Sequence, residues 1–386
     1  MIPPPLLHLF LMESNGKVKK VKIVLSDLHL GSGIFRSNGD KNARENFFFD
    51  RELIELINYF SSNKYENAPV ELILNGDILD FFTVHYKNKY LFFISEKVSL
   101  YKLKKIIKGH KKVFKALSDF LNKPNKKITY IIGNHDVDFF FKEVQNYFIQ
   151  EIGKEINQEK IKFIEDPFYE VEGKIQIHHG HQFEAMHNLN YENPFLIDKK
   201  GRKVLNLPWG SLYVMNAVNR FKLQRDYLDK VAPIYLLILY ALITDFFFIC
   251  KFILFTTYYY LRSRFVYLPL RKTTTTISRF FSLLKDEFHL LDDGEQAGRA
   301  VLKSNPDIYA IIMGHTHRPK QVTYPNHQIY VNTGTWIKSV FFGLQYFGKF
   351  NRLPFCLIEY EDEEIYPRIS LFEWKGVQSH FRYFLQ

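Results

Sequence analysis

The stretch that decides the fold is Val21-Lys-Ile-Val-Leu-Ser-Asp-Leu-His29. Its apolar first part predicts a buried β-strand that ends at Ser26, and Asp27 and His29 follow directly. In an open α/β sheet, ligands gather beyond the carboxyl ends of the strands. A strand ending in Asp-x-His therefore brings a carboxylate and an imidazole to one place. Because a single pair of this kind is usually just solvated, the rest of the chain must decide.

Four later strands are predicted to end in residues of the same chemistry, and they span 70–74, 128–132, 175–177 and 308–313. The polar residues that follow them are Asp77 and Asp80; Asn134, His135 and Asp136; His178, His179 and His181; and His315 and His317. Strand-like stretches at 329–331, 356–360 and 365–371 complete the core, and helices are expected at 49–60 and 99–121. So many Asp, His and Asn side chains at strand ends predict a metal site.

Bulk properties limit the architecture and the class of protein. A chain of 386 residues exceeds one ordinary hydrophobic core, which predicts one large domain with an insertion or two domains. The 46% hydrophobic content excludes a disordered chain, and two cysteines without paired spacing fit a reducing compartment. The Pro-rich start, Met1 to Met12, lacks the features of a secretory signal, and Met12 is an alternative start.

Positive charge is concentrated in one region. Between Gly201 and Lys285 there are thirteen Lys and Arg against three acids, a balance of +10 out of the net +11. Such a region can face nucleic acid or an anionic membrane. The basic residues accompany an apolar segment rather than a polar groove, which favours the membrane over nucleic acid.

The five blocks occur in a recognisable order: Asp-x-His, Gly-Asp-x-x-Asp, Gly-Asn-His-Asp, His-Gly and Gly-His-x-His. In this order they resemble the calcineurin-like metallophosphoesterase superfamily. The resemblance implies an α/β fold of the layered α+β kind, a β-sandwich flanked by helices. It places this domain at 21–182 and 304–386, after an N-terminal extension at 1–20. Residues 183–303 are then a large, basic and hydrophobic helical cap.

The resemblance also implies a site for two divalent metal ions. Asp77 would bridge the ions; the remaining ligands would be Asp27, His29 and His317 for one ion and Asn134, His179 and His315 for the other. Mixed nitrogen and oxygen ligands suit manganese, the preferred candidate, or iron or zinc. Two such cations supply a bridging hydroxide at neutral pH and neutralise the phosphoryl oxygens.

Other residues of the blocks have supporting roles by the same resemblance. His135 would act on the phosphate or the leaving oxygen, oriented by Asp136. Asp80 and His178 would support the ligands, and His181 would do the same or touch the substrate. The remaining histidines are interpreted as core or surface residues without a function: His8, His85, His110, His187, His289, His327 and His380.

The insertion contains the most apolar stretch of the chain, 231–261. Its longest uncharged piece, 231–244, has 14 residues, too few for a membrane-spanning helix. Because His179 and His315 must lie on the same side of a membrane to bind one ion, a single crossing is excluded. A buried helical pair and helices in the membrane interface both remain open. Basic residues before and after the apolar stretch, with Tyr258 to Tyr260, favour membrane-surface contact through 220–272.

Within the superfamily, Asn75-Gly-Asp-Ile-Leu-Asp-Phe-Phe82 and the helical insertion are similar to the UDP-2,3-diacylglucosamine pyrophosphohydrolases of lipid A synthesis. Those enzymes usually carry Arg at the position of His135 and a smaller cap. This resemblance implies a cytoplasmic, peripheral inner-membrane hydrolase of a lipid-linked or nucleotide-linked phosphoester or pyrophosphate. Two alternatives stay open: a soluble phosphodiesterase or protein phosphatase with a protein-binding cap, and a non-catalytic interaction scaffold.

Overall fold

The computed structural model describes residues 20–36, 38–89, 91–153, 158–184, 186–225, 231–232, 240–266, 294–342, 347–350, 352–361 and 366–384. Several features singled out in the sequence lie outside these residues. They are the N-terminal extension with His8 and Met12, the histidine His289, the basic residues Lys230, Arg271 and Lys272, part of the apolar stretch (233–239) and Ile365.

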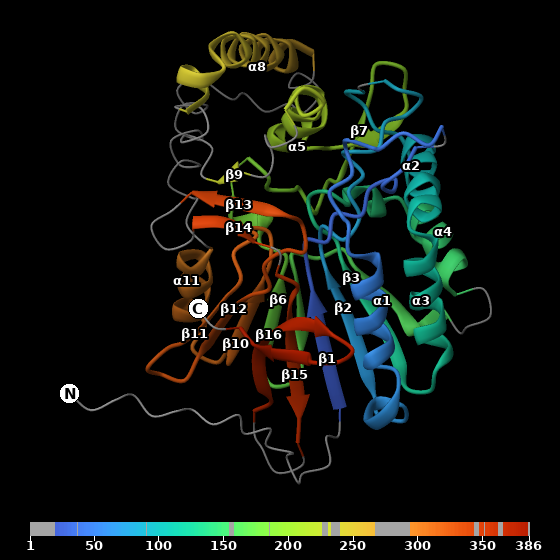
Figure 1. Cartoon of the computed structure of the whole chain (residues 1–386), viewed down its shortest axis with the longest axis vertical. Coiled ribbons are helices and arrows are strands. Elements are labelled where there is room, and N and C mark those ends of the chain that lie inside the picture. Colours follow the sequence, from blue (N-terminus) through green and yellow to red (C-terminus); the bar gives the residue numbers. More distant parts are fainter. Residues whose placement is uncertain are drawn as a thin grey trace.

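Seven strands form the larger sheet, in the order β17-β16-β15-β1-β2-β3-β4 (Figure 1). Their bounds are β1 Lys20–Leu25, β2 Val70–Asn75, β3 Lys126–Ile131, β4 Ile161–Ile164, β15 Pro354–Tyr360, β16 Arg368–Gly376 and β17 His380–Tyr383. Strands β1, β2, β3 and β4 are parallel neighbours, whereas β15 pairs antiparallel with β1. The carboxyl ends of the parallel strands therefore meet at one edge of the sheet.

The second sheet has five strands in the order β11-β12-β10-β6-β5. Their bounds are β5 Phe168–Val171, β6 Ile175–His178, β10 Ala310–Met313, β11 Lys320–Thr323 and β12 Ile329–Asn332. The three central strands, β6, β10 and β12, are parallel. The strands expected from the sequence all form, with ends that differ from the prediction by a few residues.

The two sheets pack face to face, and period-two burial in the central strands explains this. In β1, Val24 joins a buried cluster with Ile177 and Ile312 of the other sheet, while Ile23 and Leu25 point to the opposite side. Each fully buried aliphatic side chain stabilises the fold by about 1.5–3 kcal/mol. This packing confirms the predicted β-sandwich.

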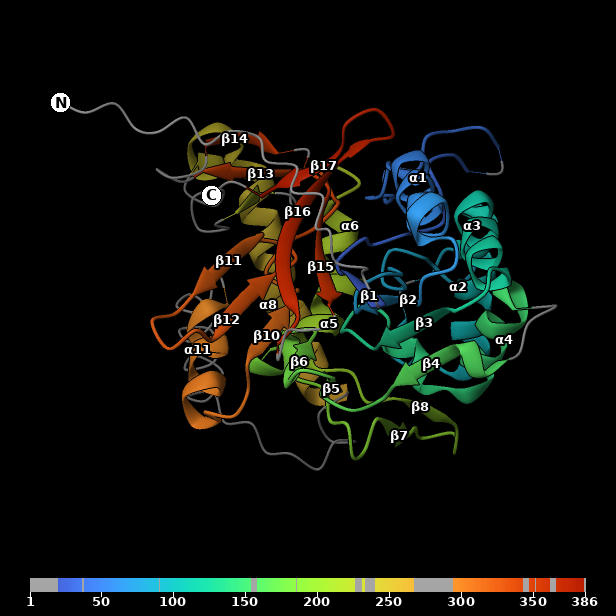
Figure 2. The ribbon, with the colours of Figure 1, turned by 90° about the horizontal axis from the view of Figure 1, so that it is seen from below.

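Helices cover the outer faces of the sandwich (Figure 2). On the larger sheet lie α1 (Asp50–Tyr59), α2 (Glu96–Gly109), α3 (Lys111–Asn122) and α4 (Lys142–Ile152), whose apolar sides share one core with that sheet. On the smaller sheet, α11 (Glu295–Ser304) packs Leu302 against Ile311 and Tyr330. The last residues of the predicted cap thus lie against the sandwich.

The prediction of one helix over 99–121 is wrong, because the helix breaks at His110. That residue leaves the helical conformation, at φ −121° and ψ 36°. Its Nδ1 lies 2.7 Å from Asp50 Oδ1 of α1, so the side chain is held outside the line of α2. The Ser32–Gly33 loop also approaches Gly109 so closely that a Cβ atom there would overlap the loop backbone. Two shorter helices, α2 and α3, result.

Before α11, the described part of the insertion contains a hairpin, several short elements and one long helix. Its elements are β7 (Phe195–Ile197), β8 (Lys203–Leu205), α5 (Trp209–Tyr213), the π-helical turn η5 (Val214–Val218), α6 (Asn219–Phe221), β9 (Val231–Ala232) and α8 (Phe246–Val266). Strand β9 pairs with β13 (Ser339–Phe342), which also pairs with β14 (Phe347–Phe350). Helix α8 lies at one end of the molecule, beyond α5 (Figure 1). Among the described helices, none is both long and apolar enough to cross a membrane.

Candidate metal centre

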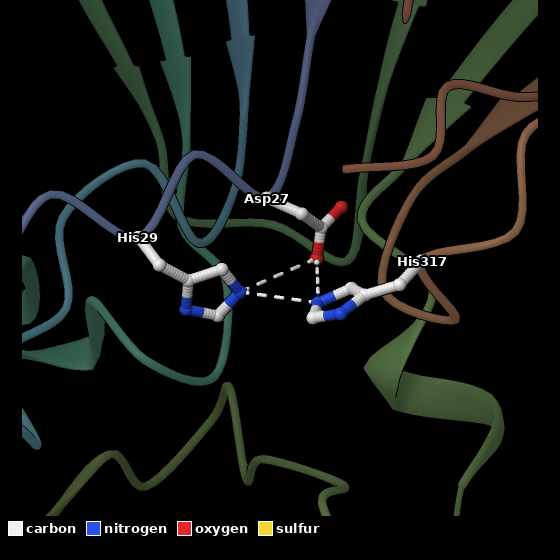
Figure 3. A group of neighbouring side chains, drawn as sticks. All are labelled: Asp27, His29 and His317. Atoms are coloured by element: carbon white, nitrogen blue, oxygen red, sulfur yellow. Dashed lines mark hydrogen bonds and ion pairs between the residues drawn. The ribbon is translucent and has the colours of Figure 1, made fainter. Parts of the chain in front are cut away.

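The loops that follow the parallel strands of both sheets converge at one edge of the sandwich. Asp27 and His29 follow β1, and their side chains point toward His317, which follows β10 (Figure 3). Residues from the loops after β2, β3 and β6 join them. The loop after β1 therefore contributes to a shared centre, together with residues nearly 300 positions away in the sequence.

Asp27, His29 and His317 form the first group of potential ligands. His317 Nε2 lies 3.2 Å from Asp27 Oδ1, and His29 Nε2 lies 3.1 Å from His317 Nε2. His29 Nε2 is also 3.9 Å from Asp27 Oδ1. Two ring nitrogens and a carboxylate oxygen that face one another in this way form a donor set suited to a divalent transition metal.

Asp77, His179 and His315 form the second group. Asp77 Oδ2 lies 3.3 Å from His179 Nε2 and 3.9 Å from His29 Nε2 of the first group. Burial alone would raise the pKa of Asp77, but His179 and His135 hold it well below its usual value. An ionised carboxylate thus stands between the two groups, which is the place required for a bridging ligand.

Three buried atoms at the centre, Asp27 Oδ1, Asn134 Oδ1 and His179 Nε2, make no well-aligned hydrogen bond among the described residues. Asp27 Oδ1 and His179 Nε2 nevertheless lie 3.2 and 3.3 Å from His317 Nε2 and Asp77 Oδ2, which are themselves atoms of predicted ligands. Buried polar atoms are normally paired, and an unpaired one costs about 1–3 kcal/mol. All three belong to side chains predicted to be ligands. Divalent ions would complete their coordination, so the residues present fit the metals that the sequence predicts.

The backbone at the centre is strained in a consistent way. Asp27, His29, Asp77, His315 and His317 have positive φ angles of 52°, 53°, 53°, 68° and 61°. Residues other than glycine rarely adopt a positive φ, and each residue that does so lowers the stability of the fold by on the order of 1 kcal/mol or more. The strain turns each side chain sharply away from its strand and toward the others.

At two glycines of the sequence blocks, neighbouring groups approach the backbone too closely to leave room for a side chain. A Cβ atom on Gly133 would overlap the carboxylate and backbone of Asp77, and one on Gly314 would overlap Ser26 and the carboxylate of Asp27. In the room that these glycines leave, one oxygen of each carboxylate accepts a backbone hydrogen bond. Asp77 Oδ1 accepts the His135 backbone N–H at 2.8 Å, and Asp27 Oδ2 accepts that of His315 at 2.9 Å. The other oxygen of each remains directed into the centre.

His135 lies at the mouth of the centre, with its ring against Phe82 at a centroid distance of 4.7 Å. Its Nδ1 is 3.1 Å from Asp80 Oδ1. Burial lowers the pKa of His135, but Asp77 and Asp80 outweigh it and raise the pKa to about 9. The two carboxylates therefore favour the protonated form of the imidazole.

The prediction that Asp136 orients His135 is wrong, because the carboxylate that contacts the His135 ring is that of Asp80. Asp136 instead accepts hydrogen bonds from the backbone N–H of Gly133 at 2.6 Å, from that of Ile78 at 3.0 Å and from the Tyr130 hydroxyl at 2.6 Å. It fixes the loop after β3, because its carboxylate is enclosed by these donors. Burial and the neighbouring Asp77 raise the pKa of Asp136 to about 7.

Asp80 supports two histidines at once. One oxygen contacts His135, and the other lies 3.8 Å from His29 Nδ1. The same carboxylate accepts the backbone N–H of Phe82 and of Thr83. The supporting role of Asp80 stays a prediction, which this geometry favours because metal-ligating histidines usually donate their second nitrogen to a carboxylate or carbonyl.

His178 and His181 lie beside the centre in different settings. The Gln182 amide lies 2.9 Å from His178 Nδ1, and burial lowers the pKa of His178 to about 4. The ring of His181 is 5.3 Å from that of His179, and its Nε2 lies 2.9 Å from the Tyr191 hydroxyl. Their predicted roles as support for the ligands, or for His181 as a substrate contact, stay predictions.

Sequence reasoning missed two residues next to the centre, Glu184 and His187. Glu184 Oε2 lies 2.8 Å from His315 Nε2 and 2.8 Å from His187 Nδ1. Burial raises the pKa of Glu184, but His315 and His187 outweigh it and hold the pKa well below its usual value. The available signal was the spacing His181-x-x-Glu184-x-x-His187 directly after the fourth block. His187, interpreted as a residue without function, is thus connected to a predicted ligand.

Comparisons with known proteins agree with this geometry. The family model described as calcineurin-like phosphoesterase matches residues 22–235, more than half of the 386-residue chain. None of the curated proteins compared with the sequence matches it significantly.

Two solved structures illustrate the structural likenesses. A dimetal phosphatase from Danio rerio is 10% identical, with a TM-score of 0.36, over 92% of this chain and 96% of its own. A predicted phosphoesterase from Streptococcus pneumoniae is 10% identical, with a TM-score of 0.28, over 95% of this chain and 97% of its own. At TM-scores below 0.5, neither likeness supports a conclusion.

Proposed function

The chain belongs to the calcineurin-like phosphoesterase family, and from this we propose that it is a two-metal hydrolase of a lipid-linked phosphoester or pyrophosphate. The observation that carries the metal-dependent part is the convergence of buried carboxylates and imidazoles in two groups, Asp27 with His29 and His317, and Asp77 with His179 and His315. Asp77 lies between the two ligand groups, as a bridging carboxylate must. Two divalent ions held there would neutralise phosphoryl oxygens and supply hydroxide at neutral pH.

The protein's own residues account for the rest of the proposed reaction. Asp80 occupies Nδ1 of His135 and leaves Nε2 for the substrate. An imidazole held through one nitrogen by a carboxylate suits the transfer of a proton to the leaving oxygen. Phe82 packs on the same ring and limits its movement. His135 is therefore the proposed general acid, and Asp80 positions it.

The lipid-linked substrate is inferred from helix α8 and from the helical residues 240–244 that precede it. One side of the helix is buried in a cluster of Phe221, Phe248, Ile249 and Phe252. The opposite side exposes a stripe of apolar side chains at helical spacing: Ile243 87%, Phe247 86%, Leu254 71%, Tyr258 55% and Leu261 48%. Large apolar patches of this kind mark interaction sites.

Positive charge on and around α8 favours an anionic lipid surface as the partner. The exposed Lys251 lies on α8 itself, and the guanidinium groups of Arg220 and Arg262 lie 5.0 and 4.9 Å from the rings of Phe255 and Phe92. Basic groups beside an apolar, aromatic helix suit a position in the interface of a membrane with anionic headgroups. A substrate with acyl chains, of which UDP-2,3-diacylglucosamine is the preferred candidate, would be reached from that position.

Incubation with substrate tests the proposal directly. The full chain, loaded with Mn²⁺, should release UMP from UDP-2,3-diacylglucosamine in detergent micelles, and Asp77→Asn should not. Turnover of a small phosphodiester without release of UMP would retain the two-metal hydrolase and reject this substrate. No turnover of either compound by the Mn²⁺-loaded, folded protein would reject hydrolysis and favour a scaffold.

A further inference from the structure

A carboxylate from the start of the insertion contacts one of the predicted metal ligands. Glu184 Oε2 lies 2.8 Å from His315 Nε2, and the two side chains are only 20% and 8% exposed. The same oxygen lies 2.8 Å from His187 Nδ1. Two ring nitrogens therefore converge on one carboxylate oxygen, which fixes the position of Glu184 between them.

The atoms involved decide how His315 can bind a metal. Because Glu184 occupies its Nε2, Nδ1 is the nitrogen left for an ion. His179 is arranged in the opposite way, since its Nδ1 lies 2.9 Å from the Asn75 carbonyl oxygen and its Nε2 faces Asp77 Oδ2. A partner on the second nitrogen fixes the tautomer and ring orientation of a metal-ligating histidine. Glu184 performs for His315 what a main-chain carbonyl performs for His179.

His187 connects this pair to the helices of the insertion. A Cβ atom on Gly210 of α5 would lie 2.8 Å from His187 Nε2 and 2.7 Å from the Met186 carbonyl oxygen, so only glycine fits. The Gly210 backbone N–H also donates to that carbonyl at 3.0 Å. The Tyr259 hydroxyl of α8 in turn donates to the Leu212 carbonyl of α5 at 3.0 Å. Contacts therefore run without a break from α8 to His315.

We propose that Glu184, held by His187, is a positioning residue that makes the second metal site depend on the insertion. Without the carboxylate, the His315 ring loses the partner that aims Nδ1 at Asp77 and His179. The first site, at Asp27, His29 and His317, has no contact with Glu184 among the described interactions and keeps its affinity. The inference rests on the proposed two-metal function.

Manganese binding by the metal-free, full-length protein provides the test. Electron paramagnetic resonance during a Mn²⁺ titration separates a mononuclear six-line signal from the signal of an exchange-coupled pair. The wild type should form the coupled pair at two equivalents. Glu184→Gln should hold the first ion normally and need about 10–100 times more Mn²⁺ to form the pair. The matched control is Glu192→Gln, an exposed glutamate of the same insertion, which should match the wild type.

Two further variants keep the test decisive if Glu184→Gln fails to fold. His187→Ala and Gly210→Ala retain Glu184 but disturb its support, and each should weaken only the second site, by a smaller factor. The inference would be overturned if the folded variants formed the coupled pair at the Mn²⁺ concentration that the wild type needs. The same result for Glu184→Gln, when that variant folds, would also overturn it. A wild type that never forms a coupled pair would instead overturn the proposed two-metal function.

Discussion

The metal centre and helix α8 depart from ordinary burial in opposite directions. At the centre, carboxylates and imidazoles are buried, and Asp27 Oδ1 and His179 Nε2 make no well-aligned hydrogen bond among the described residues. On α8, large apolar side chains such as Phe247 and Leu254 stand in solvent. Both arrangements raise the free energy of the isolated chain. In the function proposed above, each would be relieved by a different kind of partner, cations at the centre and a lipid surface at the helix.

Replacing the bridging carboxylate should have the largest effect. Asp77→Asn removes the charge between the two ligand groups and should lower kcat/KM for a phosphodiester with Mn²⁺ by at least about 10³-fold, since metal ions supply several kcal/mol of transition-state stabilisation. Steady-state hydrolysis of bis(p-nitrophenyl) phosphate measures it. Asp119→Asn, an exposed carboxylate on α3, should leave the rate unchanged. Equal rates in both variants would remove Asp77 from the mechanism.

Removing the proton donor should have a somewhat smaller effect. His135→Gln should lower kcat/KM by about 10²–10³-fold for a diester with a poor leaving group, and by less for one that releases p-nitrophenol. Since the acid must be protonated to act, the alkaline limb of the wild-type pH profile should report the loss of this proton. The variant should lack this alkaline limb. A pH profile of kcat/KM for both proteins is the measurement, and an unchanged limb in the variant would contradict the assignment.

His110 sharpens the comparison, because it is a buried charge whose partners lie within the protein. Burial lowers its pKa, but Asp50 and Glu45 outweigh this and raise the pKa to about 9. With an unfolded pKa of about 6.5, the pair stabilises the fold fully below that pH and loses the contribution as pH rises through 9. The loss should be at most about 3 kcal/mol, and it should be absent in His110→Asn. Urea unfolding between pH 6 and pH 10 measures it, and parallel curves would contradict the pairing.

Substitutions in the exposed stripe should have the smallest effect, and they should change only the binding of the protein to membranes. The double substitution Phe247→Ser, Leu254→Ser should weaken binding to phosphatidylglycerol vesicles by about tenfold or more, since the loss of only about 1.4 kcal/mol of apolar burial from the two side chains together changes affinity tenfold. Hydrolysis of a small diester should not change. Val377→Ser, at an exposed apolar residue next to the β16–β17 turn, is the control for flotation with vesicles. A wild type that does not float with vesicles would assign the stripe to a protein partner.

The sequence predicted the centre better than it predicted the supports around it. Strand ends rich in Asp and His indicated a metal site, and the resemblance of the five blocks to a known family assigned Asp27 and His317 to one ion, although β1 and β10 lie in different sheets. The positive φ of those residues could not be predicted, because it depends on loops from both sheets. Glu184 was missed because it lies three residues beyond the fourth block, in the assigned insertion. Whether Asp80 or Asp136 contacts His135 depends on the paths of the loops after β2 and β3, which the sequence does not give.

The insertion was harder to interpret for a different physical reason. Helix α8 is apolar on every side, so periodicity does not separate Phe248, which is buried against Phe221, from Phe247, which is exposed. The composition predicted an apolar helix with basic flanks. Which side of it would lack a partner followed only from its packing on α6.

Anomalous diffraction from crystals grown with Mn²⁺ tests the central claim most directly. Two peaks are predicted about 3.5–4 Å apart with Asp77 between them. One should lie among Asp27, His29 and His317, and the other among Asn134, His179 and Nδ1 of His315. No peak at this edge of the sandwich, or a single peak held only by Glu184 and His187, would contradict a two-metal phosphoesterase.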